Sequence, residues 1–456
     1  MERRVAGSIL ELIGWTPLVK LNRITNGLPS TVYAKLEYFN PGGSVKDRVG
    51  LSMISDAERR GVIKPGCVIV EPTSGNTGAG LALAALVRGY KIIFTVPDKM
   101  SSEKIDLLKA FGAKVIITPS NVPPDHPASY VKVAERIVRE TPNAFMPNQY
   151  TNPSNPSAHY QTTGPEIWKQ TGGNIDVLVA GMGTGGTISG TAKYLREMNP
   201  RIRVVGVDPE GSMLHHWFNK TAGEYHSYRI EGIGEDFMPS TLDLKVLDEV
   251  VTVSDRDAFL TARMLAREEG LLAGGSSGAA VFGALKVARD SEGKTIVVIL
   301  PDTGRNYLNR VYSDDWMTEY GYLESEEKRI AVKDILAAKS GRIRGVVAVS
   351  PEDQLSTAIE LMKKHGISHL PVIKDGVQVG SIHEMSVMKK LTSKKASKGQ
   401  RIEDVMDEPL PVVRKQELLL DPFNLLKEKN AAIVLDKNAV VGIITTIDVI
   451  NYLTKR

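Results

Sequence analysis

The chain has 456 residues, of which 42% are hydrophobic and 24% are charged. This composition is that of a soluble globular protein, and the length predicts two or three domains rather than one. The formal net charge of +4 comes from 57 basic and 53 acidic side chains, a balance that argues against nucleic acid as a partner. The single cysteine, Cys67, excludes a disulfide framework, and no apolar run reaches the roughly 18 residues of a membrane span. We therefore expect a cytoplasmic protein that does not bind a membrane.

Residues 40–48, with the sequence NPGGSVKDR, predict a tight turn that places Lys46 at the start of a helix. Ser44 is a suitable N-cap for that helix. A lysine near the positive end of a helix dipole and shielded from water should have a lowered pKa. Its neutral amine could then form a Schiff base or move a proton. Taken alone, the motif favours an ordinary surface lysine over a reactive one. The motifs in the rest of the chain, described below, favour the reactive lysine instead.

Between about residues 32 and 300, short β-branched runs alternate with helical patterns. The runs are 68–70, 91–96, 114–118, 176–180, 203–207 and 295–300. Strands of this kind, apolar on both faces, predict an α/β fold with a parallel sheet covered by helices. Ligands of such sheets bind at the carboxyl ends of the strands, so the loops after these runs are the candidate sites.

The first of these loops, residues 71–78, is rich in small and hydroxyl-bearing residues. Thr73, Ser74 and Thr77 could converge with backbone N–H groups on an anion at the start of a helix that we expect near Ala79. A plain turn would need only one such side chain, so an anion site is favoured.

The second loop, residues 181–187, fits two kinds of ligand. Gly181, Gly183 and Gly186, followed by Asp208 at the end of the next strand, have the spacing of a dinucleotide fingerprint. The same glycines with two threonines could instead wrap a single phosphate. The other hydroxyl-bearing loops favour a monophosphate cofactor, because a dinucleotide needs neither a lysine in a turn nor a second anion loop.

Two further segments carry polar candidates. Ser276, in the third glycine-rich loop (274–278), could hydrogen-bond a neutral ring nitrogen or simply cap the following helix, and the two interpretations are equally supported. Residues 147–160 contain several Asn, Ser and Pro turns, and in this segment Gln149 could face a ligand. For His159, in the same segment, we expect no functional role.

The character of the chain changes near Tyr320. Residues 323–331 are interpreted as a linker, with a preceding domain over 1–322 and a following one over 332–456. The last part repeats itself loosely: 332–336 resembles 402–406, and 380–386 resembles 442–448. Two copies, over about 332–393 and 402–456, predict a paired module whose halves pack on each other.

Four motifs in matching order resemble the β-family of pyridoxal-phosphate enzymes of fold type II, which includes cysteine synthases and cystathionine β-synthases: residues 40–48, 73–77, 183–187 and 274–278. Three later segments resemble the cystathionine β-synthase branch more than plain cysteine synthases: residues 231–234, 300–307 and 313–317. The tail resembles the paired regulatory (Bateman-type) domains named after that enzyme. The resemblance implies a catalytic region of two open parallel-sheet subdomains followed by a paired α/β regulatory module.

The resemblance also implies roles for individual residues. Lys46 would hold pyridoxal 5′-phosphate and act as the catalytic base, and Asn76 would bind the 3′ oxygen of the ring. The phosphate would lie in the cup formed by Gly183, Thr184, Gly185, Gly186 and Thr187. Ser276 would contact the pyridine nitrogen. The substrate carboxylate would be bound by Thr73, Ser74, Thr77 and Gln149.

Three features concern departures from the family and the regulatory part. Glu235 stands where animal members carry a tyrosine, which makes the identity of the second substrate less secure. The animal enzymes bind haem through an N-terminal extension that is not expected here, so we predict no haem and no metal. In the second tail copy, Thr445 and Asp448 suit an adenosyl ligand such as S-adenosylmethionine or an AMP-type molecule, whereas the first copy has His383 and Ser386 at those places. A purely structural role for the tail is equally open.

The expected reaction is a β-replacement in which L-serine and L-homocysteine give cystathionine through an aminoacrylate intermediate. A cysteine synthase that uses O-acetylserine or serine with sulfide is the nearest alternative. A sensor of adenosyl ligands on a retired enzyme scaffold is the non-enzymatic one. The resemblance further implies a homodimer or homotetramer.

Overall fold

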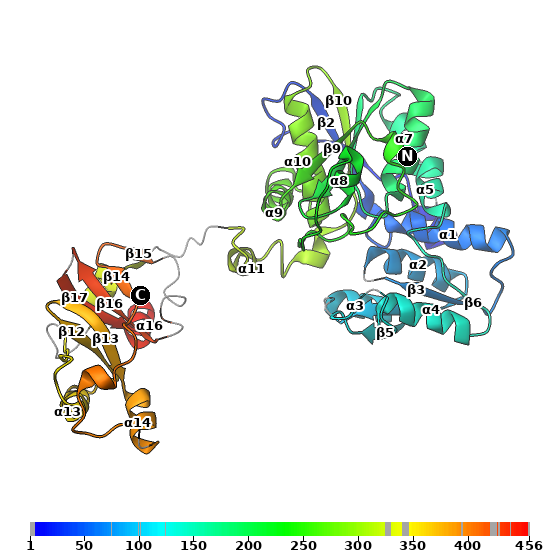
Figure 1. Cartoon of the computed structure of the whole chain (residues 1–456). Coiled ribbons are helices and arrows are strands. Elements are labelled where there is room, and N and C mark those ends of the chain that lie inside the picture. Colours follow the sequence, from blue (N-terminus) through cyan, green and yellow to red (C-terminus); the bar gives the residue numbers. More distant parts are fainter. Residues whose placement is uncertain are drawn as a thin grey trace. The chain divides into compact units, whose positions relative to one another are not determined.

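The computed structural model describes residues 5–454 except 74, 99, 101, 124, 324–329, 340–345, 394, 420–425, 427, 428 and 438. The chain forms two compact units, Met1–Glu324 and Ser325–Arg456, which are described separately (Figure 1).

The first unit contains two sheets, of which the larger has six strands. In spatial order these are β1 (Leu18–Lys20), β2 (Thr31–Leu36), β10 (Thr295–Leu300), β7 (Val177–Gly181), β8 (Arg203–Pro209) and β9 (Glu249–Val253). Strand β1 is antiparallel to β2, and every other neighbouring pair is parallel. The strand order reverses between β10 and β7, so the loops after these strands open on opposite sides of a crevice at their carboxyl ends.

Helices cover both faces of the larger sheet. One face packs against α9 (Asp255–Met264), the π-helical turn η5 (Leu265–Glu269), α10 (Gly275–Arg289) and α11 (Asp314–Glu319). The other packs against α6 (Gly164–Gln170), α7 (Gly186–Met198) and α8 (Leu214–Asn219). Helix α5 (Ser154–Ala158) and the π-helical turn η3 (His159–Thr163) precede α6 and lie against α7.

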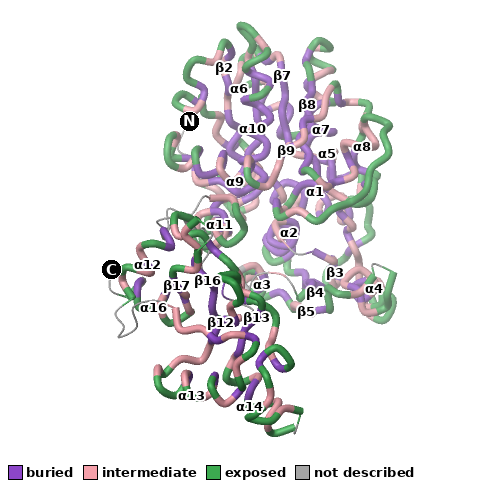
Figure 2. The backbone as a smooth tube through the Cα atoms, turned by 60° about the vertical axis from the view of Figure 1, so that its left-hand side comes forward, coloured by how far each residue is buried: buried purple, intermediate pink, exposed green. Residues whose placement is uncertain are grey.

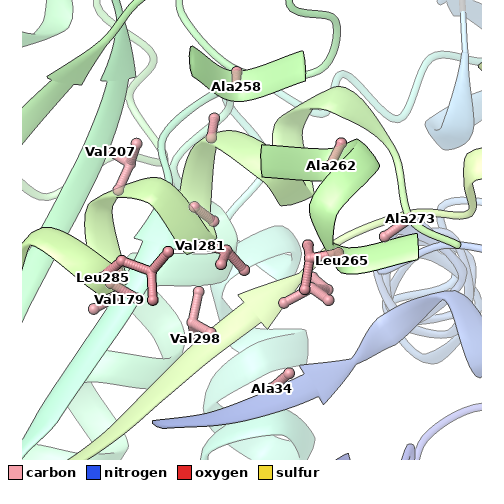
Figure 3. Close-up of a cluster of buried hydrophobic side chains, with 14 of the residues drawn as sticks. Ala34, Val179, Val207, Ala258, Ala262, Leu265, Ala273, Val281, Leu285 and Val298 are labelled. Atoms are coloured by element: carbon pink, nitrogen blue, oxygen red, sulfur yellow. The ribbon is translucent and has the colours of Figure 1, made fainter. Parts of the chain in front are cut away.

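Figure 3 shows the apolar packing on the first face. Val179, Val207 and Val298 point from adjacent strands toward Val281 and Leu285 of α10. All five side chains are buried, which explains why these strands read as continuous apolar runs. Figure 2 shows burial along the whole chain: the central strands are buried, and the outer loops are exposed.

The smaller sheet has four parallel strands: β5 (Lys114–Thr118), β4 (Lys91–Pro97), β3 (Val68–Pro72) and β6 (Ala144–Phe145). Its helices are α1 (Lys46–Arg59), α2 (Asn76–Val87), α3 (Ser102–Ala110) and α4 (Tyr130–Glu140). Short 3₁₀ turns complete the unit: η1 (Ile9–Leu12), η2 (Glu37–Phe39), η4 (Leu244–Val246) and η6 (Gly304–Tyr307). The predicted class, a parallel α/β region with two open sheets, is confirmed.

The second unit begins with β11 (Ile330–Ala331) and α12 (Val332–Ala338). The first copy contains α13 (Leu355–His365), β12 (His369–Lys374), β13 (Val377–His383) and α14 (Glu384–Thr392). The second contains η7 (Ile402–Asp404), β14 (Val412–Arg414), β15 (Leu418–Leu419), β16 (Ala431–Asp436), β17 (Ala439–Thr445) and α16 (Thr446–Thr454). Both copies place a helix directly after the second strand of an antiparallel pair, at the residues whose sequences match.

The two copies exchange their leading segments. Val332 and Ile335 of α12 pack in the core of the second copy, whereas Ile402 and Val405 pack in the core of the first. The repeats therefore pack on each other, as the sequence predicts. The leading segments differ in form, since α12 is an α-helix and η7 a single 3₁₀ turn.

Two predictions about helix starts are wrong. Helix α2 begins at Asn76 rather than near Ala79. Val45, not Ser44, occupies the N-cap position of α1, although the Ser44 Oγ accepts a hydrogen bond of 3.1 Å from the Lys46 N–H. Of the predicted linker, residues 330 and 331 form β11, and residues 324–329 lie outside the described part of the chain.

Candidate active site

Loops that follow β3, β7 and β10 surround a cavity of about 660 Å³ in the first unit. Seven of the predicted site residues line it: Lys46, Thr73, Asn76, Thr77, Gln149, Thr184 and Ser276. They come from sequence positions up to 230 residues apart (46 to 276). The fold therefore gathers motifs that the sequence shows only as separate turns.

Lys46 is the first residue of α1, and close backbone packing places it beside the start of α2. A Cβ added to Gly80 of α2 would overlap the Lys46 carbonyl oxygen, and one added to Gly50 would overlap the Gly80 backbone. Glycine at both positions lets the two helices touch. Burial lowers the pKa of Lys46, and the negative charges of Asp302 and Glu235 oppose this only in part. The amine is therefore easier to deprotonate than an exposed lysine.

Arg48, in the first turn of α1, holds this helix in place through two ion pairs. Its guanidinium donates to Glu37 at 2.7 Å and to Glu166 at 2.6 Å, and all three side chains are buried. Bidentate pairs of this kind have fixed geometry, so the start of α1 is held in one orientation. These ion pairs could not be predicted, because Glu37 and Glu166 lie in separate segments of the sequence.

The predicted substrate residues lie together, except that Ser74 falls outside the described residues. The Thr77 hydroxyl donates to Gln149 Oε1 at 2.5 Å, and Thr73 lies on the same wall of the cavity. Beneath them the buried Glu71 accepts the N–H groups of Asn148, at 2.8 Å, and of Gln149, at 3.0 Å. Burial raises the pKa of Glu71 to about 7. Glu71 fixes the backbone of the Gln149 loop. It was not predicted as a site residue, and the only feature of the sequence that points to it is an acidic residue directly after the apolar run 68–70.

Asn76 has a partner that the sequence did not indicate. Its Nδ2 donates to Asp302 Oδ2 at 2.9 Å, and the Tyr307 hydroxyl donates to the same oxygen at 2.7 Å. Asp302 follows β10 and pairs in a backbone bridge with Ser44. Its Oδ1 is buried and has no hydrogen-bond partner among the described residues. Asp302 thus connects the loops that carry Lys46 and Asn76.

The loop predicted to form the phosphate cup, residues 183–187, lies at the start of α7. Thr184 lines the cavity, and Gly183, Gly185 and Gly186 are buried beside it. Gly185 has a φ of +82°, which only glycine adopts without strain. Gly183 allows the loop to pass the carbonyl oxygen of Gly232, which a Cβ would approach to 2.7 Å. Thr187, in the first turn of α7, is half-buried and bonds to His159 at 3.2 Å.

Ser276 lies inside the first turn of α10 and does not cap that helix. The N-cap position belongs to Gly274, and no side chain caps the helix there. Ser276 is buried and lines the cavity, while the neighbouring Ser277 Oγ is buried without a partner among the described residues. Of the two interpretations of Ser276, the capping role is excluded and a role toward a ligand stays open.

Glu235 and Tyr150 also line the cavity. Burial, with repulsion from Asp236, raises the pKa of Glu235 to about 8, and the charge of Lys46 counteracts part of that rise. The pKa of Tyr150 lies well above its usual value because of burial and the nearby Glu235. Glu235 and Lys46 thus line the same cavity, and the charge of each affects the pKa of the other.

In the second unit, Thr445 and Asp448 bind each other. Asp448 Oδ2 accepts the Thr445 N–H at 2.9 Å and its hydroxyl at 2.7 Å, and the same oxygen accepts Lys339 Nζ at 2.8 Å. At the matching places of the first copy, the His383 ring lies against His369, and the Ser386 hydroxyl donates to an aspartate.

The described part of the chain lacks two kinds of feature. No helix there is long and apolar enough to cross a membrane. No group of three or more His, Cys, Asp and Glu side chains in the same part of the chain is arranged to hold a metal ion.

Comparison with known proteins matches residues 9–302 to the family of pyridoxal-phosphate dependent enzymes, and residues 332–393 and 402–455 to the CBS domain. The chain is 40% identical over 476 aligned positions to a cystathionine beta-synthase of Dictyostelium discoideum, covering 100% of this chain and 93% of that protein. It is 43% identical to the cystathionine beta-synthase of Apis mellifera, covering 99% and 92%. The chain belongs to the cystathionine β-synthase family.

A solved structure from this family agrees with the fold. The O-acetylserine dependent cystathionine beta-synthase from Helicobacter pylori has a TM-score of 0.63 and 41% identity, and the match covers 68% of this chain and all of that chain. Membership identifies the chain as an enzyme with pyridoxal phosphate as its cofactor and small molecules as its substrates.

The residues present fit that cofactor. A phosphate ester needs hydrogen-bond donors and a positive field, and Thr184 and Thr187 supply hydroxyl groups at the N-terminus of the 13-residue helix α7. An aldehyde needs an amine that is neutral part of the time, and Lys46 supplies one in the same cavity.

Proposed function

We propose that the chain condenses L-serine with L-homocysteine to give cystathionine and water, with pyridoxal phosphate bound in the cavity of the first unit. One observation supports this most strongly: Lys46 shares a single cavity with the hydroxyl groups of Thr73 and Thr77, in a chain that aligns with cystathionine β-synthases over its whole length. When bound, the cofactor supplies an electron sink for the α-carbon of the amino acid.

The phosphate end would be held by the loop 183–187, and the ring by Asn76 and Ser276. Asn76 is a good donor for a ring oxygen because Asp302 accepts one of its two amide hydrogens and leaves the other free. Ser276 carries a hydroxyl, which unlike a carboxylate would leave a ring nitrogen largely unprotonated. That choice moderates electron withdrawal and favours the loss of a β-substituent.

The carboxylate of serine would be bound by Thr73, Ser74, Thr77 and Gln149. The Thr77 hydroxyl and the Gln149 amide now bind each other, so both groups are held at one place in the cavity wall. Glu71 holds the backbone behind Gln149, which limits the freedom lost when substrate binds.

Lys46 Nζ would remove the α-proton of serine and return a proton to the β-hydroxyl, which leaves as water. The thiol of homocysteine would then add to the β-carbon and give its proton to Nζ, and Nζ would return that proton to the α-carbon. Burial lowers the pKa of Lys46 and so raises the fraction of amine able to accept the proton.

An alternative first substrate is supported by one comparison. The Helicobacter pylori relative, at 41% identity, is described as O-acetylserine dependent. O-acetylserine offers a better leaving group at the same β-carbon, and the residues proposed for its carboxylate are the same. A cysteine synthase activity with sulfide would use this first half as well.

Rates with paired substrates separate these functions. Purified holoenzyme is given serine or O-acetylserine, each with homocysteine or sulfide, and kcat/KM is compared for the four pairs. We expect serine with homocysteine to be preferred. A higher kcat/KM for sulfide would assign the protein to cysteine synthesis, and no turnover with any pair would refute the proposal.

The second unit is proposed to bind an adenosyl ligand at Thr445 and Asp448, and the enzyme to form a homodimer or homotetramer. The matched CBS domains support the first statement, since such domains commonly bind adenosyl ligands. A cytoplasmic location stays a prediction, supported by the single buried cysteine, Cys67.

A further inference from the structure

Two buried side chains lie behind the phosphate cup, on the side away from the cavity. Asn155 belongs to α5 and His159 to the π-helical turn η3, four residues further along the chain. Each bonds to one threonine of the cup, and both are at most 1% exposed. Neither lines the cavity, so any effect on the cofactor would pass through Thr184 and Thr187.

Asn155 fixes the role of the Thr184 hydroxyl. Its Nδ2 donates to the carbonyl oxygen of Gln149 at 2.8 Å and to Thr184 Oγ1 at 2.9 Å. Because a carbonyl can only accept, the atom facing it must be the amide nitrogen and not the amide oxygen. Thr184 Oγ1 is therefore an acceptor toward Asn155, which leaves its own hydrogen free to point into the cavity.

His159 bonds to the Thr187 hydroxyl, as Asn155 does to that of Thr184. Its Nε2 lies 3.2 Å from Thr187 Oγ1, and its Nδ1 lies 2.8 Å from Thr163 Oγ1. Burial, together with the positive charge of Arg48, lowers the pKa of His159 to about 3, so the ring is neutral and carries one hydrogen. If Thr163 donates to Nδ1, then Nε2–H donates to Thr187, and the Thr187 hydrogen is free. An anion in the cup favours this tautomer, because the other one turns that hydrogen away from it.

The contact between this segment and α7 leaves no room for rearrangement. A Cβ on Gly186 would overlap the Asn155 amide, and one on Gly190 would overlap the Pro156 carbonyl oxygen and lie 3.0 Å from the His159 Cβ. Single π-helical turns occur often at functional sites, and this one shifts the residues after Ala158 around the helix axis.

We propose that Asn155 and His159 are positioning residues for the cofactor phosphate. Each donates a hydrogen bond to the oxygen of one cup threonine, so that the hydroxyl hydrogens of Thr184 and Thr187 both point toward the phosphate. This inference rests on the proposed function only in that the loop 183–187 must hold that phosphate.

The test measures the dissociation constants of two ligands for the apoenzyme: pyridoxal phosphate, and pyridoxal, which lacks the phosphate. The His159→Leu variant should bind pyridoxal phosphate about tenfold more weakly, the size of effect expected when one hydrogen bond to a charged group is lost. Its affinity for pyridoxal should match that of the wild type. A general loss of packing would weaken both ligands equally.

Three further variants separate the explanations. His159→Gln keeps an N–H donor near the position of Nε2 and should restore pyridoxal phosphate binding to within about threefold. Asn155→Asp keeps the size of the side chain but removes the amide that donates to Thr184 and to the Gln149 carbonyl, and it should also weaken only the phosphate-bearing ligand. Tyr160→Phe is the matched control, because its hydroxyl bonds at the surface to Glu197, and it should bind both ligands as the wild type does.

The possible outcomes separate a failure of the proposed function from a failure of the inference about Asn155 and His159. If the wild type binds neither ligand, the proposed function fails. If the wild type binds pyridoxal phosphate and the His159 and Asn155 variants bind it equally well, or lose both ligands equally, the inference is overturned. If His159→Leu does not fold, as judged by circular dichroism, the comparison of Asn155→Asp and Tyr160→Phe decides by the same criterion.

Discussion

The cavity that contains Lys46 and the Thr445–Asp448 pair both contain residues that were predicted from short motifs after strands, but the hydrogen bonds of these residues differ. In the cavity, two of the predicted side chains bond to residues from distant segments: Asn76 to Asp302, and Thr77 to Gln149. In the second unit, the predicted pair bonds locally: Asp448 accepts the backbone and hydroxyl hydrogens of Thr445, three residues away, at the start of a helix, and its one distant partner is the exposed Lys339.

The second arrangement has an ordinary structural explanation, because an acid that binds a nearby N–H group stabilises the start of a helix. Helix capping does not explain Lys46, Asn76 and Gln149 in one cavity. The comparison teaches that convergence of distant segments is stronger support for a site than a local motif.

Lys46→Ala should lower turnover by about three orders of magnitude or more, because no other group in the proposed mechanism moves the α-proton. It should also remove the cofactor absorbance near the edge of the visible range. Steady-state rates and an absorbance spectrum of purified protein check this. Lys109→Ala, at the exposed Asp106 pair on α3, serves as the control. Retained turnover in Lys46→Ala would contradict the mechanism.

Asp302→Asn should reduce kcat/KM for serine by about 10- to 100-fold, because the half-buried Asn76 amide would lose its charged acceptor. Tyr307→Phe removes a donor to the same oxygen and should have a smaller effect. Steady-state kinetics of the two variants with a fixed thiol concentration give both numbers. Equal effects, or none, would show that Asp302 does not orient Asn76.

Glu71→Gln should raise KM for serine about tenfold with a smaller change in kcat, because one of the two backbone N–H groups at Asn148 and Gln149 loses its acceptor. Kinetics at saturating thiol separate KM from kcat. A fall in kcat without any change in KM would exclude a role in holding the substrate loop.

The same substitution should alter the pH dependence of stability. The pKa of Glu71 is raised from 4.5 to about 7, so its ionisation opposes folding. This cost is absent below about pH 4.5 and complete above about pH 7, where it is on the order of 3 kcal/mol. Relative to Glu71→Gln, the wild type should therefore lose stability as the pH rises through this window. Urea unfolding at pH 5 and pH 8 tests the sign, and an opposite trend would refute it.

Lys339→Ala should strengthen binding of S-adenosylmethionine or AMP by about two- to threefold, because it frees Asp448 from a partly exposed ion pair. Basal kcat/KM should not change. Lys415→Ala breaks a similarly exposed pair with Asp436 and is the matched control. Calorimetric titration gives the affinities. Binding of neither ligand to any of these proteins would remove the proposed adenosyl site and leave the tail a structural role.

Most of the catalytic fold could be predicted because its strands are buried on both faces and read as continuous apolar runs. Strand β9 (Glu249–Val253) lies at the edge of its sheet, is only partly buried and was missed. Helix starts were misplaced by up to three residues, as at Asn76, because capping depends on neighbours that a single sequence does not reveal.

Some residues of the candidate site could be predicted from the sequence, and others could not. Lys46, Asn76 and Thr184 could be found because each lies in a turn whose glycines and hydroxyl groups are unusual for a structural loop. Asp302 and Asn155 could not, since their importance comes from partners more than 25 residues away. His159 was assigned no function from its surroundings in the sequence. Only its burial behind Thr187 gives it one to test.

The central claim is that Lys46 is the amine that holds the cofactor. Borohydride reduction of the holoenzyme fixes the pyridoxal group to whichever lysine carries it, and peptide mass spectrometry then locates the modified residue. The account predicts the label on Lys46, in the segment 40–48, with full loss of activity. Modification of a different lysine, with Lys46 left free, would contradict it.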